Sequence, residues 1–245
     1  TVSNITSMPG GICLYNSSDN TIYNNTVYNV SYMGQQEVAM GIALNGESNR
    51  NNITLNEIYT SSIGIGLASS NNTNVSLNNI YNNYYGIFSS SSTGHNISDN
   101  TFYDDGIYLT GSELSHYIHT INMGNTVDGY PIRYYKNDTG SVVLDENNDT
   151  SQVILVNCSN FEIRNMTFNK SVFKTLHLVN SDNINISNCT LTNISNYGVG
   201  ITVVNSNYCN ITNCSDINGQ SSVDTTGISF TNSSNCTIRD NTITN

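Results

Sequence analysis

Apolar and polar positions alternate over short runs along most of this chain, and the alternation recurs at a nearly constant interval. The recurring phrase is an aliphatic residue, two variable residues, an asparagine, one variable residue and a second apolar residue. Ile53, Asn56 and Ile58 form one copy, and the asparagine recurs 22 residues later at Asn78 and again at Asn100. Self-similarity at a fixed short period is typical of a solenoid, in which each repeat supplies one turn. This interval predicts one coil of a parallel β-helix.

The asparagine of this phrase predicts a ladder along one corner of the coils. An asparagine that points inward at a corner can bond backbone groups and the asparagine of the next coil. We interpret these residues as scaffold and not as ligands. The expected ladder members are Asn25, Asn56, Asn78, Asn100 and Asn241.

A second phrase, Gly-Ile-x-Leu or a close variant, precedes the asparagine phrase in most coils. Alternate residues of a strand face the same side, so Ile12 and Leu14 are expected to point into the core together. The glycine before them predicts a corner that needs unusual backbone angles or a close approach. Polar turns such as Asn16–Asn20 separate the strands.

These patterns predict an all-β fold, a single-stranded parallel β-helix of about ten coils of roughly 22 residues. We expect one domain over 1–245, with regular coils in 1–109 and 151–245. Residues 110–150 lose the repeat, which predicts irregular coils with a protruding loop or hairpin packed on the same core.

Composition narrows the possible partners. Asparagine supplies 44 of the 245 residues, which suits a fold with many tight turns. The net charge is −11, and nucleic acid is excluded as a partner because neutralising phosphates needs clustered Lys and Arg. No apolar stretch approaches the roughly 20 residues of a membrane span, so no membrane insertion is expected. No secretory signal begins the sequence, which fits a mature chain whose signal was removed.

Both termini suggest an interrupted coil. The last residues stop partway through a coil, and the first residues resemble the missing remainder. An uncapped parallel coil presents unpaired backbone groups that template pairing with another chain. We therefore expect subunits to stack end to end, and the candidate polymer ends are Thr1, Val2, Ile5, Ile243 and Asn245.

The six cysteines fall at positions that can be aligned between coils. Cys189 and Cys214 take the asparagine position of successive phrases, and Cys209 and Cys236 share another register. Stacked coils lie about 4.8 Å apart, close to the Cα separation that a disulfide tolerates. The candidate bridges are therefore Cys189–Cys214 and Cys209–Cys236, and the alternative is buried thiols that act as small hydrophobes.

Two cysteines and several sequons remain. Cys13 and Cys158 have no aligned partner and are candidate intermolecular or free thiols. Asn-x-Ser/Thr sequons are numerous, and most follow from the Asn, Ser and Thr content alone. An extracellular setting would allow covalent glycans on a few. The candidate glycosylation sites are Asn16, Asn71, Asn137, Asn148 and Asn232.

Candidate chemistry is sparse. Asp104 and Asp105 are the one pair of adjacent aspartates, and glycoside hydrolysis needs two carboxylates that flank the scissile bond. His116, His119 and Met123 suggest a soft-metal site, but a three-residue spacing puts the two histidines on opposite faces of a strand. Surface histidines are the favoured reading. We expect no catalytic residues, no metal site and no cofactor.

Tyrosines cluster in the middle third of the chain. Exposed tyrosine can stack on sugars or form a protein interface, because its ring is apolar and its hydroxyl is polar. Interface or turn-packing roles are favoured over a sugar site. The clustered residues are Tyr81, Tyr84, Tyr85, Tyr103, Tyr108, Tyr117, Tyr130, Tyr134 and Tyr135.

A passage in the second half of the chain resembles a module of NosD-like β-helix proteins. It comprises His116–His119, the run Asn-Thr-Val-Asp-Gly-Tyr-Pro-Ile-Arg-Tyr-Tyr-Lys-Asn at 125–137, and Ile-Leu-Val-Asn-Cys-Ser-Asn at 154–160. The likeness is greatest to the versions on methanogen surfaces, which build S-layer and sheath components. The resemblance implies a right-handed coil and an archaeal cell-surface context. Bacterial NosD proteins are linked to copper delivery, and no ligand cluster in this sequence matches that role.

The leading hypothesis is a structural protein of an extracellular layer or tube, located on the cell-envelope surface. Its partner would be itself, assembling end to end and laterally into a homopolymer without enzymatic activity. The alternative hypothesis is a surface β-helix that binds polysaccharide, or degrades it as a lyase or hydrolase.

Overall fold

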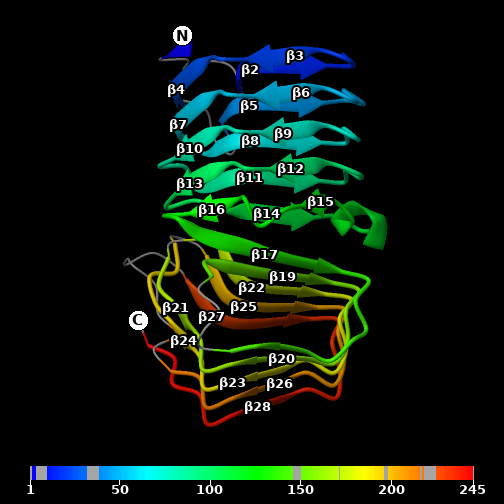
Figure 1. The fold of residues 1–245 in the computed structure, drawn as a ribbon, viewed down its shortest axis with the longest axis vertical. Helices are drawn as coiled ribbons and strands as arrows, with labels where there is room; N and C mark the ends of the chain where they lie inside the picture. Colours follow the sequence, from blue (N-terminus) through cyan, green and yellow to red (C-terminus); the bar gives the residue numbers. More distant parts are fainter. Residues whose placement is uncertain are drawn as a thin grey trace. The chain divides into compact units, whose positions relative to one another are not determined.

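The computed structural model describes residues 2–3, 10–31, 39–145, 150–170, 172–195, 198–215, 217 and 225–244. In this part of the chain the regular structure is β-strand except for one 3-10 helix, η1 (Leu114–Tyr117). The strands stack as successive coils, each paired in parallel with the equivalent strand of the next coil (Figure 1). The predicted all-β parallel solenoid is confirmed.

The chain divides into two compact units, Thr1–Gly129 (unit 1) and Tyr130–Asn245 (unit 2). Each unit consists of stacked coils. The expectation of one domain over the whole chain stays a prediction.

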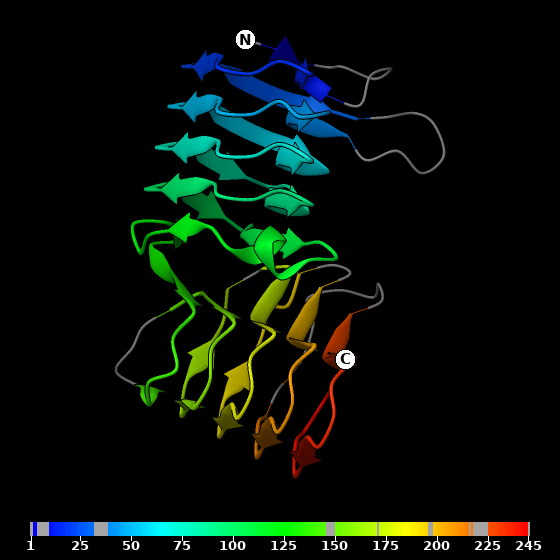
Figure 2. The same ribbon diagram turned by 90° about the vertical axis from the view of Figure 1, so that its right-hand side faces the viewer.

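Unit 1 contains three stacks of parallel strands. One stack comprises β1 (Val2–Ser3), β4 (Thr26–Val30), β7 (Glu57–Ser61), β10 (Asn79–Tyr81), β13 (Thr101–Tyr103) and β16 (Thr126–Val127). The second comprises β2 (Gly10–Tyr15), β5 (Met40–Asn45), β8 (Ile63–Ala68), β11 (Tyr85–Ser90) and β14 (Ile107–Thr110). The third comprises β3 (Thr21–Tyr23), β6 (Asn52–Thr54), β9 (Asn74–Ser76), β12 (Asn96–Ser98) and β15 (Thr120–Ile121). Figure 2 shows these coils from the side.

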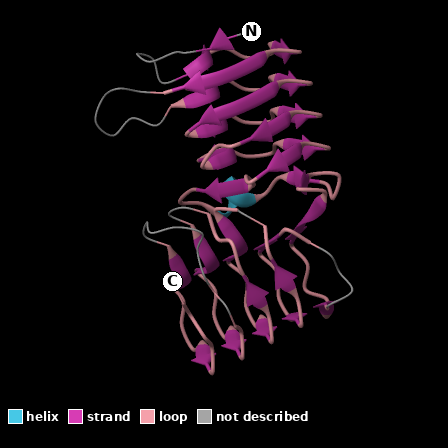
Figure 3. Cartoon of the chain, turned by 90° about the vertical axis from the view of Figure 1, so that its left-hand side faces the viewer, coloured by secondary structure: helices cyan, strands magenta, loops and turns pink. Residues whose placement is uncertain are grey.

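Unit 2 repeats the arrangement with its own stacks. The longest strands are β17 (Tyr130–Lys136), β19 (Gln152–Val156), β22 (Lys174–Val179), β25 (Val199–Val204) and β27 (Thr226–Thr231). The shorter strands are β18 (Val142–Leu144), β20 (Phe161–Arg164), β23 (Asn185–Ser187), β26 (Asn210–Thr212) and β28 (Thr237–Arg239). A two-stranded stack is formed by β21 (Thr167–Phe168) and β24 (Thr190–Leu191). Strands and connecting turns alternate throughout (Figure 3).

The short strands follow from the alternation of side chains. In β6, β9 and β12 the central aliphatic residue is fully buried, whereas its two polar neighbours are partly or fully exposed. The buried centres Ile53, Val75 and Ile97 stack on one another in register. Burying such side chains is the main driving force for closing each coil.

Coil length is less uniform than expected. In the described residues the longest strands form a stack of five in each unit, in agreement with about ten coils. The 22-residue spacing holds from Ile53 through Val75 to Ile97, but register partners lie 25 residues apart at Ile186 and Ile211, and 27 apart at Ile211 and Ile238. Individual coils therefore differ in length by several residues.

Glycine is needed where consecutive coils approach closely. A Cβ on Gly64 would lie 2.7 Å from the carbonyl oxygen of Gly86, and one on Gly86 would lie 2.8 Å from that of Gly106. Backbone atoms cannot retreat from such a contact as a flexible side chain can. The Gly-Ile-x-Leu phrase therefore records a steric requirement of the corner that precedes the buried Ile65 and Ile87.

The stretch 110–150 contains the irregular coil. η1 lies here, and Tyr117 at its end is buried, with its hydroxyl donating to the carbonyl oxygen of Gly111 at 2.9 Å. The described strands on either side of this helix pair in parallel with their neighbours.

Candidate functional site

A ladder of asparagine side chains runs through one corner of unit 1. The backbone N–H of Asn56 donates to Oδ1 of Asn78 at 2.9 Å, and the N–H of Asn78 donates to Oδ1 of Asn100 at 3.0 Å. The side-chain Nδ2 of Asn78 donates to the same oxygen of Asn100 and to the carbonyl of Ile53. Asn25 begins the ladder, donating to Oδ1 of Asn56. These hydrogen bonds satisfy buried N–H and carbonyl groups that solvent does not reach.

Asn125 extends this ladder, although the sequence interpretation did not include it. Its Oδ1 accepts the N–H of Asn100 at 3.1 Å, and its Nδ2 donates to the carbonyl of Ile97. The spacing from Asn100 is 25 residues instead of 22, because the coil that contains η1 is longer. The phrase did not identify it because three residues, instead of two, separate Asn125 from Ile121, the register partner of Ile97.

Asn241 lies in unit 2, where cysteines occupy the equivalent corner. The N–H of Cys214 donates to Oδ1 of Asn241 at 2.8 Å, and Nδ2 of Asn241 donates to the carbonyl of Ile211. Cys189 and Cys214 stack one coil apart in this column, joined by a side-chain hydrogen bond. That bond together with burial raises the pKa of the Cys189 thiol above its ordinary value.

A second cysteine pair lies at the corner before β26. The N–H of Cys209 donates to Sγ of Cys236 at 3.3 Å, and burial raises the pKa of Cys209 to about 12. All six cysteines are thiols in this structure. In both predicted pairs the two thiols thus lie next to each other, and the formation of disulfides between them stays a prediction. Cys158 is buried and Cys13 is exposed.

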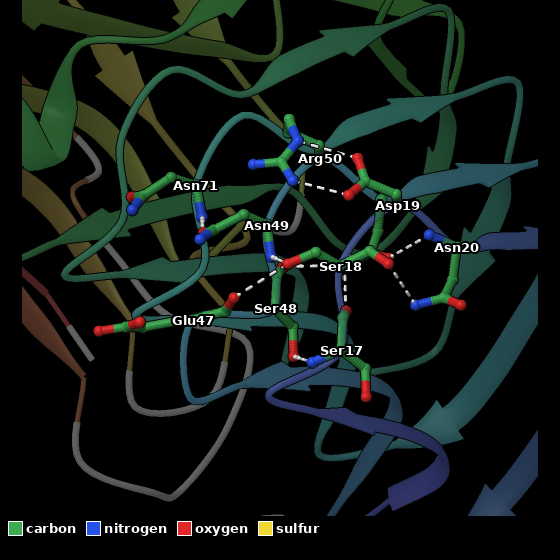
Figure 4. A network of polar contacts seen from close by, with 10 residues as sticks. Ser17, Ser18, Asp19, Asn20, Glu47, Ser48, Asn49, Arg50 and Asn71 are labelled. Carbon is green, nitrogen blue, oxygen red and sulfur yellow. Dashed lines mark hydrogen bonds and ion pairs between the residues drawn. The ribbon is translucent and has the colours of Figure 1, made fainter.

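Side chains of the polar turns, some inward and some outward, form further hydrogen bonds between neighbouring coils (Figure 4). The inward Ser48 Oγ accepts the N–H of Ser17 in the preceding coil, whereas the outward Ser18 Oγ accepts the N–H of Asn49 in the following coil. Arg50 forms a two-pronged ion pair with Asp19 at 2.6 and 2.8 Å. Both of these charged side chains are solvent-exposed, so the pair holds the turn without being a buried site.

Two titratable side chains occupy inward ladder positions in unit 1. His95 is fully buried, its Nδ1 accepts the N–H of Thr73 at 3.1 Å, and its ring stacks on His119 at 5.0 Å. Burial, with the His119 ring, lowers the pKa of His95 to about 3. Asp105 is also buried and accepts two hydrogen bonds from Asn83. Burial raises the pKa of Asp105 to about 8 despite those bonds.

The paired carboxylates therefore do not share a cleft. Asp105 points into the coil, whereas Asp104 is an exposed residue with φ of 56° at the corner. The imidazoles of His116 and His119 do not converge either. His119 is buried in the ladder, and its Nε2 lies 3.0 Å from the backbone carbonyl oxygen of His116. Met123 is 60 % exposed.

A column of tyrosines runs along the outer side of β4, β7, β10 and β13. Tyr28, Tyr59 and Tyr81 stack face to face, with ring centroids 5.0 and 4.6 Å apart. Tyr103 meets Tyr81 edge-on and is 47 % exposed. The hydroxyl of Tyr81 donates to Glu57 at 2.9 Å. The other three rings are partly buried, so Tyr103 is the most exposed member of this column.

The outer side of β3, β6, β9, β12 and β15 carries no charged residue; we call it the neutral face. Its outward residues are Thr21, Tyr23, Asn52, Thr54, Asn74, Ser76, Asn96, Ser98 and Thr120. Asn74 donates to Oδ1 of Asn52 at 2.7 Å, and Asn96 donates to Oδ1 of Asn74 at 2.8 Å. These bonds fix one row of amides along the stack of strands.

The candidate glycosylation sites lie mostly at the surface. Asn16, Asn137 and Asn232 are exposed, and each has a positive φ. Asn71 is half-buried, and its Oδ1 accepts the N–H of Thr93 at 2.8 Å. Asn148 lies outside the described residues, and glycans at all these positions remain predictions.

The candidate polymer ends are only partly described. Thr1, Ile5 and Asn245 lie outside the described residues. Val2 belongs to β1, which pairs with β4, and Ile243 bridges Ile217 and is 54 % exposed.

Stacked coils, side-chain ladders and parallel sheets define this chain as a parallel β-solenoid repeat protein. A family model described as "Periplasmic copper-binding protein (NosD)" matches residues 1–126. The chain belongs to the NosD family. No curated protein sequence matches it.

Among solved structures, the chain is similar to the enzymatically active domain of bacteriophage CBA120 tailspike protein 2. The two share 15 % identity with a TM-score of 0.28, over 91 % of this chain. This chain spans 32 % of the length of that tailspike chain.

The family description names copper. The donor atoms of the described residues do not form a copper site. Within the described residues, no three side chains of His, Cys, Asp or Glu converge on one point. Nδ1 of His95 and Nδ1 of His119 each accept a backbone N–H. Nε2 of His95 is buried without a partner in this part of the chain, but a single nitrogen does not make a site. The donor atoms in the described ranges therefore do not fit a copper site.

No helix in the described ranges is long and apolar enough to cross a lipid bilayer.

Proposed function

We propose that this chain is a structural β-solenoid of the cell envelope, a component of an extracellular protein layer that assembles end to end and laterally. The periplasmic family to which it belongs supports an envelope location. Its inward polar groups serve as rungs between coils, which suits a mechanical role. The archaeal sheath or S-layer setting belongs to the same proposal.

One observation carries the end-to-end part of this proposal. In β27 and β28 the residues that continue the core columns are open to solvent: Ile238 is 54 % exposed, and Ile228 is only partly buried. Their register partners one coil earlier, Ile211 and Ile201, are fully buried. These side chains need cover from a further coil, supplied by more of the same polypeptide or by another subunit.

A second copy can supply that coil because β2 and β3 of unit 1 stand at the edges of their parallel sheets. Heterologous contacts of this kind do not close and so generate filaments. Backbone pairing between unpaired strand edges would add to the burial of the exposed apolar side chains. The proposal therefore assigns the cover to a second copy.

Electron microscopy and light scattering at increasing concentration test the proposal. Wild-type protein should form filaments or sheets, and the variant Ile238→Asp should remain monomeric because a carboxylate cannot be buried unpaired at the contact. The control Val143→Asp changes a side chain that is 46 % exposed on the first short strand of unit 2, and it should still assemble. A wild-type protein that stays monomeric at every concentration would contradict the proposal.

A polysaccharide-binding role is the second candidate, favoured by the exposed ring of Tyr103. Binding of neutral polysaccharides, lost in Tyr103→Ala and kept in Tyr208→Ala, would support it. Tyr208 is a matched control because it is 56 % exposed in unit 2. Cleavage of the polysaccharide in the same assay would separate an enzyme from a binder.

A further inference from the structure

The neutral face of unit 1 is regular enough to meet another flat surface. Its five strands pair one residue to one residue. The amides of Asn52, Asn74 and Asn96 are tied into a row along the solenoid. The hydroxyls of Ser76 and Thr54 form a second row, 3.2 Å apart. Rows of this kind interlock when two such sheets face each other.

Charge leaves this face open to contact between copies. The chain carries a net charge of −11, and residues 1–129 hold nine acidic residues but Arg50 as their one base. The strands of the neutral face carry no carboxylate, whereas Glu57 lies on the tyrosine-bearing sheet. The stack of β2, β5, β8, β11 and β14 is also uncharged, so charge disfavours the tyrosine-bearing sheet and does not separate the other two faces. Asp99 stands at the edge of the neutral face, where it accepts a hydrogen bond from Asn122 at 3.2 Å.

Two leucines at the edge of the face provide the second observation. Leu55 and Leu77 follow β6 and β9 directly and are 46 % and 53 % exposed. Both adopt left-handed backbone angles, with φ of 58° and 57°. The same column holds Asn24 and Asp99 in neighbouring coils, with φ of 54° and 55°. Asparagine and aspartate tolerate this conformation, whereas a leucine there has a strained backbone and a solvent-exposed apolar side chain.

We propose that the neutral face, with Leu55 and Leu77 at its edge, is the lateral contact between two copies of this chain. The contact is isologous, so each copy presents the same face about a two-fold axis. It buries the two strained leucines and pairs the polar rows. This inference rests on the proposed function, since it names the surface through which lateral packing takes place.

The size of the face sets the strength of the contact. Five strands at about 4.8 Å spacing extend about 19 Å, and strands of three residues add a width of about 10 Å. The resulting area of about 200 Å² is far below the roughly 800 Å² that each partner of a stable dimer buries, so a single pair associates weakly. Repetition across a layer makes such a contact effective, because each further contact is then intramolecular.

The double variant Leu55→Asn, Leu77→Asn tests the contact. Asparagine suits the left-handed backbone, so the melting temperature of the monomer should stay the same or rise. The dissociation constant for lateral association should rise by about tenfold or more, because the buried apolar anchors are gone. Sedimentation velocity measures the association and circular dichroism the melting.

Tyr208→Asn is the matched control. Tyr208 has φ of 56°, is 56 % exposed, and shares its column with Asn183 and Asn235 in unit 2. The substitution relieves the same kind of backbone strain away from the neutral face. The melting temperature should therefore rise, while the dissociation constant for lateral association stays as in wild type. If the leucine variant melts lower, Ser76→Asp on the same face replaces it and should also abolish lateral association.

The outcomes separate this inference from the proposed function. Wild type that assembles while the leucine and Ser76→Asp variants assemble equally well overturns the lateral contact and leaves the proposed function standing. Wild type that never assembles removes both. A monomeric wild type that binds neutral polysaccharide, and loses it in the leucine variant, replaces the second copy with a glycan on this face.

Discussion

Single residues in this chain are chosen by the backbone angle or the ladder position they occupy. Most non-glycine residues with positive φ in the described part are Asn or Asp, and they stand at the corners where the chain turns. These side chains tolerate left-handed angles and bond nearby backbone groups. The high asparagine content therefore reflects two separate demands, one for turning and one for bonding between coils.

His95 makes the ladder sensitive to acid. Its pKa is about 3 in the fold and about 6.5 when unfolded, so the unfolded chain binds the proton first as the pH falls. The stability that neutral His95 contributes is present above about pH 6.5 and is lost progressively down to about pH 3. At about pH 4 the loss is roughly 3 kcal/mol at most, from 1.36 kcal/mol per pKa unit.

His95→Asn should remove that loss. Asn51 already fills the same column, where its Oδ1 accepts the N–H of Asn20 at 2.7 Å, so an amide can replace the imidazole. We expect the fall in melting temperature between about pH 7 and pH 4 to be smaller in the variant than in wild type. An equal fall in both proteins would show that His95 does not set the acid response.

The residue-scale predictions from sequence succeeded where the whole asparagine phrase was present. Asn56, Asn78 and Asn100 recur every 22 residues, and the phrase also located Asn25, 31 residues before Asn56. The phrase is interrupted at Asn125, and His95 and Asp105 serve inward columns with side chains that the phrase does not contain. Spacing and identity within one sequence cannot reveal that a different functional group performs the same bonding.

At the scale of the element, side chains at a corner form columns, and each column accepts backbone N–H groups from one neighbouring coil, either the preceding or the following one. Inward side chains accept the N–H of the preceding coil, as Asn100 does for Asn78 and Ser181 does for Cys158. Outward side chains at the turns accept the N–H of the following coil, as Asn71 does for Thr93. Opposite directions on the two faces satisfy successive N–H groups of one turn, which a single direction could not do.

Asn78→Leu should weaken the solenoid through this column. The variant leaves the N–H of Asn56 and the carbonyl of Ile53 without their partners in a buried corner, which costs on the order of 1–3 kcal/mol. Urea unfolding measures the change. The control Asn96→Leu alters an exposed amide and should cost much less. Equal midpoints for Asn78→Leu and wild type would count against a stabilising ladder.

Strand positions and inward faces were predictable because alternation with period two is local. The length of each coil was not, since it varies with turns whose entropic cost grows only slowly with their length. The pairing of Cys189 with Cys214 followed from register, and the structure does place these side chains next to each other. Whether they oxidise depends on the compartment and not on the fold.

At the scale of the whole molecule, charge is unevenly divided along the sequence. Residues 1–129 contain nine acids and one base, whereas residues 130–245 contain nine acids and six bases. Copies of an acidic chain repel one another at low ionic strength, and this repulsion opposes any assembly.

Added salt should therefore promote association. At about 0.5 M NaCl the Debye length falls to a few ångströms, so repulsion between copies is screened while apolar burial persists. Light scattering should show a higher weight-average mass than at low salt. Dissociation on adding salt would instead indicate a contact held by ion pairs, such as acidic residues of unit 1 against bases of unit 2.

The direction of the inward ladders bears on how the protein is made. A ribosome releases the coils in order, and an N–H that bonds into an inward ladder finds its acceptor only in the coil synthesised next. A newly emerged coil is thus unfinished until its successor arrives, so closure should advance along the nascent chain one coil behind synthesis. A pause in translation would hold the newest corner open for as long as the pause lasts.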